Sequence, residues 1–232
     1  MGRIYLVRHA QASLLNDDYD QLSPLGLEQS RQLGRWFAAR KERFDVAVCG
    51  TLRRQSQTAH ACLAQLPSPP TLGVDAAFDE YGHHELFANA PEEMSSHAAV
   101  SARVRSSATP RKDFHELVSR AFDEWVRGDS DTRRPRSWAV FRADCVAALE
   151  QVARQCGSGQ NAIVVSSGGV IASICQHLMG VPDDRVADLH WVLYNASVTR
   201  LLSRPGCITL STFNSVAHLE AGDPQAALVT YR

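Results

Sequence analysis

The sequence predicts an α/β fold in which a mostly parallel central sheet is wrapped by helices on both faces. Three observations lead to this prediction. Short apolar runs typical of strands alternate with longer segments of helical periodicity along most of the chain. Three of those runs are apolar on both faces, as expected for strands that helices cover on each side. The chain has 232 residues, which is long enough for one large domain with a sizeable core.

Five strands are expected from their apolar and β-branched content. They are predicted at residues 3–8, 44–49, 162–167, 196–203 and 206–213. The first three are the runs that are apolar on both faces, so they are placed in the interior of the sheet.

Helices are expected between these strands. The first begins at Ser23-Pro24, an N-cap residue followed by proline at the first helical position, and its apolar stripe runs to about residue 40. A second helix ends before the sequence PSPP, which cannot continue it. The second and later helices are predicted at residues 52–65, 112–127 and 137–156, and from Gly169 to about residue 180.

A helical insertion of approximately residues 85–157 separates the early strands from the later ones. Within it, residues 89–113 are rich in Ser and Ala and weakly apolar, which predicts a mobile connection or the edge of a lid. No internal repeat is present, and the prediction is a single domain over residues 1–232.

Composition excludes several classes of function. The formal net charge is -1, so no electrostatic case exists for binding nucleic acid or an anionic membrane. No run of about 18 apolar residues is present to span a membrane. The six cysteines lack C-x-x-C spacing and several lie in apolar runs, which favours buried, reduced thiols over disulfides or a zinc site. The sequence goes directly into the first predicted strand, without the charged and apolar pattern of a signal peptide, so a cytoplasmic location is expected.

Polar groups collect where three predicted strands end. Arg8 and His9 end the first strand, Arg53 and Arg54 open the helix after the second, and a glycine pair beginning at Gly168 follows the third. The carboxyl ends of parallel strands meet at one edge of a sheet. Guanidinium groups and free backbone N–H groups at that edge would cradle a phosphoryl group. Each element alone also fits a solvated strand end or an exposed helix face, so the prediction depends on their combination.

The motifs around these residues resemble those of the histidine phosphatase superfamily, which has the phosphoglycerate mutase-like fold. The segment LVRHAQAS resembles the Arg-His-Gly signature of the family, with Ala10 in place of the glycine. Five later segments resemble further motifs of the family in the same order: YDQLSPLGLEQSRQLG, TLRRQSQTA, FDEYGHHELF, VVSSGGVIASI and YNASVTRL. Together the matching segments span residues 4 to about 201.

The resemblance implies a role for four side chains. His9 would be the nucleophile that accepts the phosphoryl group, and Arg8 and Arg54 would bind the phosphoryl oxygens. Glu80 would protonate the leaving oxygen and then take a proton from the attacking water. The adjacent Asp79 is an alternative for that acid. The phosphohistidine mechanism implied by the resemblance requires no metal and no other cofactor.

One departure from the family concerns its second histidine. Ser167 stands where that imidazole is expected, and it donates a hydrogen bond without a charge. The loss is expected to slow the reaction by about tenfold to a few hundredfold, and Ser167→His to recover up to about two orders of magnitude. His83 is a candidate replacement for phosphate binding, and His84 follows it. His190 is expected to be structural.

The leading expectation is a phosphatase acting on a small phosphorylated metabolite. Phosphoglycerate mutase-type transfer is less favoured, because no second phosphate site or carboxylate clamp is recognisable. A non-catalytic sensor of phosphate ligands is the alternative from another class, motivated by Ser167. A serine hydrolase at Ser167 would need a Gly-x-Ser-x-Gly elbow that SSGGV does not supply. A homodimer is left open.

Overall fold

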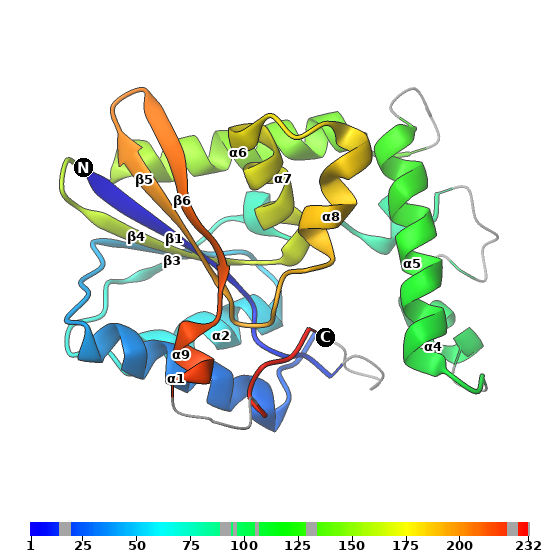
Figure 1. Cartoon of the computed structure of the whole chain (residues 1–232), viewed down its shortest axis with the longest axis horizontal. Coiled ribbons are helices and arrows are strands. Elements are labelled where there is room, and N and C mark those ends of the chain that lie inside the picture. Colours follow the sequence, from blue (N-terminus) through cyan, green and yellow to red (C-terminus); the bar gives the residue numbers. More distant parts are fainter. Residues whose placement is uncertain are drawn as a thin grey trace.

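The computed structural model describes residues 1–13, 20–88, 94, 97–104, 107–128, 134–221 and 227–231. Within these ranges one six-stranded sheet has the strand order β3-β2-β4-β1-β5-β6 (Figure 1). Its members are β1 (Gly2–Arg8), β2 (Val46–Cys49), β3 (Leu72–Val74), β4 (Asn161–Ser166), β5 (Val198–Arg204) and β6 (Cys207–Ser215). The five predicted strands are confirmed with shifted ends. The additional strand β3 is a three-residue edge strand, too short to give a periodicity signal.

The sheet is mostly parallel, as predicted. β1 pairs with β4 in parallel, and β2 lies parallel to both β4 and β3, whereas β5 runs antiparallel to β1 and β6. In the β1–β4 register Arg8 lies opposite Ser166. The residues that follow these two strands therefore leave the sheet side by side at its carboxyl edge.

Alternation along β1 divides the core between the two faces of the sheet. Ile4 and Leu6 join one buried cluster, while Tyr5 and Val7 join the other. Figure 1 shows α6 (Trp138–Gln155) and α7 (Gly168–Met179) covering one face, and α1 (Pro24–Ala39) and α2 (Arg53–Leu63) covering the other. The predicted two-sided covering of the sheet is confirmed.

Local chemistry accounts for the helix ends. The Ser23 hydroxyl accepts a hydrogen bond from the Gly26 amide at 3.0 Å, and Pro24 opens α1, as predicted. At the other end of the fold, α7 stops at Gly180, whose φ of +65° is a left-handed conformation that glycine adopts without strain.

The predicted connection at residues 89–113 is partly wrong. It contains α4 (His97–Val104) and the start of α5 (Pro110–Arg127). Val100 and Val104 lie four residues apart and are both buried, so one face of this Ser- and Ala-rich segment packs into the core. Residues 89–93, 95–96 and 105–106 fall outside the described ranges. The remaining short elements are α3 (His83–Leu86), α8 (Val186–His190), α9 (Ala217–Glu220), η1 (Ala76–Phe78) and η3 (Asp183–Arg185).

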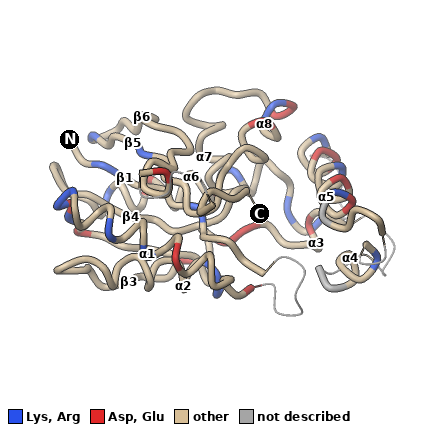
Figure 2. Tube along the Cα trace, turned by 60° about the horizontal axis from the view of Figure 1, so that its bottom comes forward, with Lys and Arg blue, Asp and Glu red and all other residues tan. Residues whose placement is uncertain are grey.

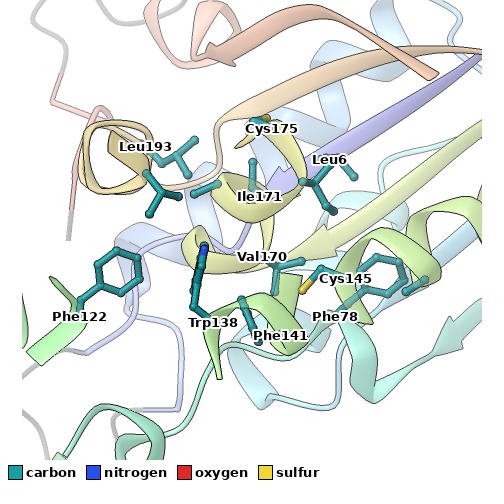
Figure 3. Close-up of a cluster of buried hydrophobic side chains, with 14 of the residues drawn as sticks. Leu6, Phe78, Phe122, Trp138, Phe141, Cys145, Val170, Ile171, Cys175 and Leu193 are labelled. Atoms are coloured by element: carbon teal, nitrogen blue, oxygen red, sulfur yellow. The ribbon is translucent and has the colours of Figure 1, made fainter. Parts of the chain in front are cut away.

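The helices inserted before β4 are joined to the body by an aromatic cluster. Figure 3 shows side chains from α5, α6 and α7 meeting there. Phe122 of α5 packs edge-on against Trp138 of α6 with 5.4 Å between ring centroids, and Trp138 is 5.4 Å from Phe141. The Trp125 indole donates to the Arg136 carbonyl at 2.8 Å, so the buried polar atom is satisfied. Of the inserted helices, α6 covers one face of the sheet, whereas α3, α4 and α5 lie to one side of it.

Charge and cysteine placement fit the composition. Figure 2 shows basic and acidic positions interspersed along the described part of the trace, including along α5. All six cysteines are free thiols, as predicted, and four of them are buried: Cys49, Cys62, Cys145 and Cys175. Over the described part of the chain, no helix combines the length and the apolar character needed to cross a membrane.

Candidate active site

One cavity of about 290 Å³ opens at the carboxyl edge of the sheet. Five of the seven predicted site residues line it: Arg8, His9, Arg54, Glu80 and His83. These come from the end of β1, the start of α2 and the segment around α3. The two others, Ser167 and Gly168, are not among its lining residues.

The two ring nitrogens of His9 have different partners, and one of them keeps an unprotonated lone pair. Its amide donates to the Ser166 carbonyl at 2.8 Å, which anchors the residue to the end of β4. Nδ1 lies 2.9 Å from the Ala10 carbonyl, and because a carbonyl only accepts, Nδ1 carries the proton. Nε2 accepts from Arg54 Nε at 3.3 Å. Burial, followed by the charges of Arg54 and Arg8, holds the pKa of His9 well below its usual 6.5.

The loop after His9 is supported by α1 and α2. The Ala10 amide donates to the Thr58 hydroxyl at 3.0 Å, and the Gln11 amide to the Gln29 side chain at 2.8 Å. Gly26 allows the close approach of this loop, since a Cβ atom there would lie 2.1 Å from the Gln11 carbonyl oxygen. The segment after Ser23 therefore fixes the position of the imidazole.

The two arginines that open α2 have different surroundings. Arg54 is buried and Arg53 is exposed. Asp20 accepts from Arg54 Nη1 at 2.7 Å and from the Arg53 amide at 2.8 Å. Its carboxylate thus offsets positive charge at a helix N-terminus, where a cation alone is unfavourable. Sequence reasoning missed Asp20, because it lies 34 residues before Arg54 and follows no helix-cap pattern.

Arg8 ties the chain end to the site. Its Nη1 donates to the carbonyls of Leu193 and Tyr231, the second at 3.0 Å. The Asn195 amide donates to the Thr230 carbonyl at 2.8 Å, which holds the same terminal segment. The Arg8 guanidinium is therefore oriented by carbonyl groups of residues that lie more than 180 positions later in the chain.

Glu80 faces His9 and the arginines across the cavity. Both carboxylate oxygens accept from the Gly169 amide, at 3.1 and 3.2 Å. Burial raises the pKa of Glu80 above its usual 4.5, and the Gly169 and Tyr81 amides and the two arginines oppose that rise. A carboxyl group with a raised pKa is suited to donate a proton.

Asp79 has another set of contacts. Its two oxygens accept from the amide and the hydroxyl of Thr51, each at 2.5 Å. It does not line the cavity. These bonds position the turn before α2.

Ser167 is completely buried, and its hydroxyl accepts from Gln55 Nε2 at 2.8 Å. The same Gln55 nitrogen donates to the Phe78 carbonyl at 2.9 Å. The Gln55 amide therefore occupies the space beside Ser167. Gly168 packs beneath the His190 ring, where a Cβ atom would lie 2.9 Å from Cε1.

Two further aromatic groups reach the cavity wall. His83 lines the cavity and stacks on Phe87, with 5.4 Å between ring centroids, whereas His84 is exposed. His190 is buried, as a structural residue would be, yet it also lines the cavity. Its Nε2 lies 2.7 Å from the Tyr81 hydroxyl. Sequence reasoning missed the Tyr81–His190 pair, since 109 residues separate its members.

The arrangement places an imidazole of lowered pKa, two guanidinium groups and a carboxyl group of raised pKa around one space. Such a set can attack an electrophilic centre, stabilise negative charge on its oxygens and protonate a leaving group. Among the residues that the structure describes, no three His, Cys, Asp or Glu side chains are grouped to hold a metal ion.

Comparison with known proteins identifies the family. A family model described as the histidine phosphatase superfamily (branch 1) matches residues 4–121 and 105–216. No curated protein matches the chain by sequence.

Solved structures with similar folds include several phosphatases. An Entamoeba histolytica phosphoserine phosphatase mutant in complex with phosphoserine has a TM-score of 0.66 and 18% identity, with 94% of this chain and 100% of that chain covered. Bacillus stearothermophilus YhfR has a TM-score of 0.68 and 17% identity, with 94% and 99% covered. A mycobacterial glucosyl-3-phosphoglycerate phosphatase complexed with VO3 has a TM-score of 0.60 and 19% identity, with 92% and 98% covered. At these identities the similarity establishes the phosphoglycerate mutase-like fold alone.

Proposed function

Because the chain belongs to the histidine phosphatase superfamily (branch 1), we propose that it hydrolyses a small phosphomonoester through a phosphohistidine on His9. One observation carries this proposal. The Ala10 carbonyl holds the Nδ1 proton of His9, so Nε2 keeps its lone pair, which accepts from Arg54 Nε until a phosphoryl group bound by Arg54 takes its place. An imidazole in that tautomer, with a lowered pKa, is ready to attack phosphorus at neutral pH.

The first half of the reaction transfers the phosphoryl group to the enzyme. Nε2 of His9 attacks phosphorus as the bond to the ester oxygen breaks. Glu80 donates its proton to that oxygen, so the leaving group departs as a neutral alcohol. Arg8 and Arg54 hold the non-bridging oxygens, whose charge the guanidinium groups offset.

The second half releases phosphate. The Glu80 carboxylate takes a proton from a water molecule, whose oxygen attacks phosphorus while the bond to Nε2 breaks. His9 returns to its neutral form, Glu80 is again protonated, and inorganic phosphate leaves. Every proton transfer uses a group of this chain, and the scheme needs no metal.

The phosphate-binding roles of Ser167, Gly168 and His83 stay predictions. The bond from Gln55 to the Ser167 hydroxyl supports an indirect role for Ser167 in shaping the wall. The position of His83 in the lining supports contact with a bound ester. A cytoplasmic location and a homodimer also stay predictions.

A second candidate function is a non-catalytic sensor of phosphate ligands. The specific observation behind it is Ser167, since the site lacks an imidazole at that position. The two functions differ in one respect: a sensor binds phosphate esters but forms no covalent intermediate.

The deciding experiment measures hydrolysis of nitrophenyl phosphate with EDTA present, together with acid-quench trapping of labelled phosphohistidine. We expect turnover and a trapped intermediate in the wild type, and neither in His9→Ala. His84→Ala, which alters an exposed histidine, serves as the control and should match the wild type. A His9→Ala protein with wild-type activity would exclude the nucleophile. Tight ligand binding without a trapped intermediate would select the sensor.

A further inference from the structure

Beyond the phosphate-binding end, the cavity wall is largely apolar, and His83, His190 and Asn195 are its polar members. Five of its lining side chains are hydrophobic and come from separate parts of the chain: Leu52, Leu86, Phe114, Val118 and Trp191. The aromatic ring of Tyr81 also lines the cavity, and these six side chains are called the apolar wall below. The part of a substrate that extends away from phosphorus meets this wall.

Charged groups in the lining are confined to the phosphate-binding end. Arg8, Arg54 and Glu80 are the Lys, Arg, Asp or Glu residues among the described residues that line the cavity. All three have roles at phosphorus in the proposed reaction. The polar lining groups beyond that end are His83, Asn195 and the Tyr81–His190 pair, whose hydroxyl and Nε2 lie 2.7 Å apart, and none of them carries a fixed charge like that of a Lys, Arg, Asp or Glu side chain. Burying such a charge without a partner is costly.

The apolar wall is preformed. Phe114 and Val118 are one turn apart on α5, so they project from the same side of that helix. Trp191 is held edge-on by His115 and by Phe122, with ring centroids 5.1 and 5.4 Å away. Leu86 is buried at the end of α3. Because these side chains are already packed, binding an apolar group costs little reorganisation.

We propose that this wall binds the alcohol part of the substrate, and that the substrate is a phosphomonoester of an apolar or aromatic alcohol. The proposal rests on the proposed phosphatase function, since it takes the phosphoryl group to lie at His9. The inserted helices α3 and α5 then determine specificity, while the strand ends carry the chemistry. Anionic or zwitterionic esters such as phosphoserine are disfavoured, because their extra charges find no partner on the wall.

A homologous series of n-alkyl phosphates, from ethyl to hexyl, tests the proposal. Each methylene that enters an apolar site is expected to raise kcat/KM about fourfold, until the cavity is filled. An ester whose alcohol stays in water gives no such slope. Phosphoserine should be hydrolysed more slowly than butyl phosphate, which has a similar length.

Variants of the wall provide the second measurement. Phe114→Ala and Val118→Asn should flatten the chain-length slope, and the loss should appear in KM. Val192→Ala is the matched control, because Val192 is 45% exposed beside Trp191 and does not line the cavity. It should keep the wild-type slope.

Binding of n-alkylphosphonates, measured by calorimetry, separates the two proposals. Their affinity should rise about fourfold per methylene whether or not the protein has turnover. A flat series, or a preference for phosphoserine in a protein that hydrolyses nitrophenyl phosphate, overturns the apolar subsite and leaves the phosphatase standing. A steep phosphonate series without any turnover overturns the phosphatase and keeps the subsite.

Discussion

At the scale of single residues, the proposed mechanism sets opposite protonation requirements for Glu80 and His9 within one cavity. His9 must be neutral to attack, and burial together with Arg54 and Arg8 lowers its pKa. Glu80 must hold a proton, and burial raises its pKa even though the same arginines oppose the rise. Desolvation disfavours the charged form of both groups, so it produces the two shifts in the directions that the chemistry needs.

The first prediction concerns the leaving group. Glu80→Gln removes the proton donor, so hydrolysis of alkyl phosphates should fall by about two to three orders of magnitude. Nitrophenyl phosphate should lose far less, because its leaving oxygen is stable without a proton. The comparison of kcat/KM for the two esters is the measurement. Equal losses on both would remove Glu80 from the acid role. Asp79→Asn, which changes only the Thr51 contacts, should not produce this leaving-group dependence.

A second residue-scale prediction concerns Ser167, and the structure changes it. From the sequence, Ser167→His alone was expected to restore a donor and raise the rate. Gln55 fills the space beside this hydroxyl, so an imidazole at residue 167 would displace a buried amide. We now expect Ser167→His to give no gain and to lower thermal stability, since overpacking costs about 1–3 kcal/mol.

The double variant Ser167→His/Gln55→Ala provides the control. It removes the obstructing side chain and should raise the phosphatase rate above that of Gln55→Ala by about tenfold or more. A gain in the single variant equal to that in the double variant would show that Gln55 does not block the position.

At the scale of elements, the short helix α3 joins the catalytic segment to the inserted helices. A four-residue helix has little stability of its own. Glu85 in α3 is buried. Its carboxylate accepts hydrogen bonds from the Gly82 amide at 2.5 Å and from Arg136 Nε at 2.7 Å. Arg134 donates to the carbonyls of Glu85 and Leu86, the second at 3.1 Å. These bonds position both the segment that follows Glu80 and one side of the apolar wall.

Glu85→Ala should therefore lower the free energy of unfolding by about 2–3 kcal/mol, measured by urea denaturation. This is below the usual loss for a broken buried pair, because Arg136 is 30% exposed and also lies 3.4 Å from Asp144. The matched control is Glu116→Ala, which breaks an exposed pair with Lys112 and should change stability by about 0.5 kcal/mol or less. Equal effects would show that the Glu85 contacts do not anchor α3.

At the scale of the whole molecule, the site joins the two ends of the chain. Figure 1 shows the C-terminal segment beside the end of β1. Gln29 of α1 donates to the Leu228 carbonyl at 2.7 Å and to the Thr230 hydroxyl at 2.9 Å, and Arg8 donates to the Tyr231 carbonyl at 3.0 Å. Cooperative unfolding of the sheet therefore dismantles the site as well, and a ligand at the site should stabilise the entire fold.

Vanadate at about 100 times its dissociation constant should stabilise the folded protein by about 2.7 kcal/mol. For a protein of this size we expect the Tm to rise by about 5–10 °C. Arg54→Ala should lose most of that shift, because it removes a buried cation from the phosphate-binding end. Arg53→Ala, at the exposed neighbouring position, should retain it. The measurement is differential scanning calorimetry, and an unchanged Tm in the wild type would contradict anion binding at this cavity.

Much of the candidate site could be predicted from local sequence. Arg8 and His9 follow directly from an apolar strand, and Arg54 and Glu80 lie in short motifs with characteristic spacing. The structure brings these four together at one sheet edge, because the carboxyl ends of parallel strands meet there. The local prediction that was partly wrong was the connection at residues 89–113, where a short apolar face on α4 was hidden among Ser and Ala.

By itself, the sequence determined the order of the main strands and helices, the family, and four of the residues that line the cavity. Each of these depends on periodicity or motifs within about twenty residues. Only the tertiary structure decided that Asp20 pairs with Arg54, that Gln55 closes the space at Ser167, and that Tyr81 meets His190. Those contacts join residues 34, 112 and 109 positions apart. They exist because strand order and register bring distant segments together, and no local pattern of side chains encodes that geometry.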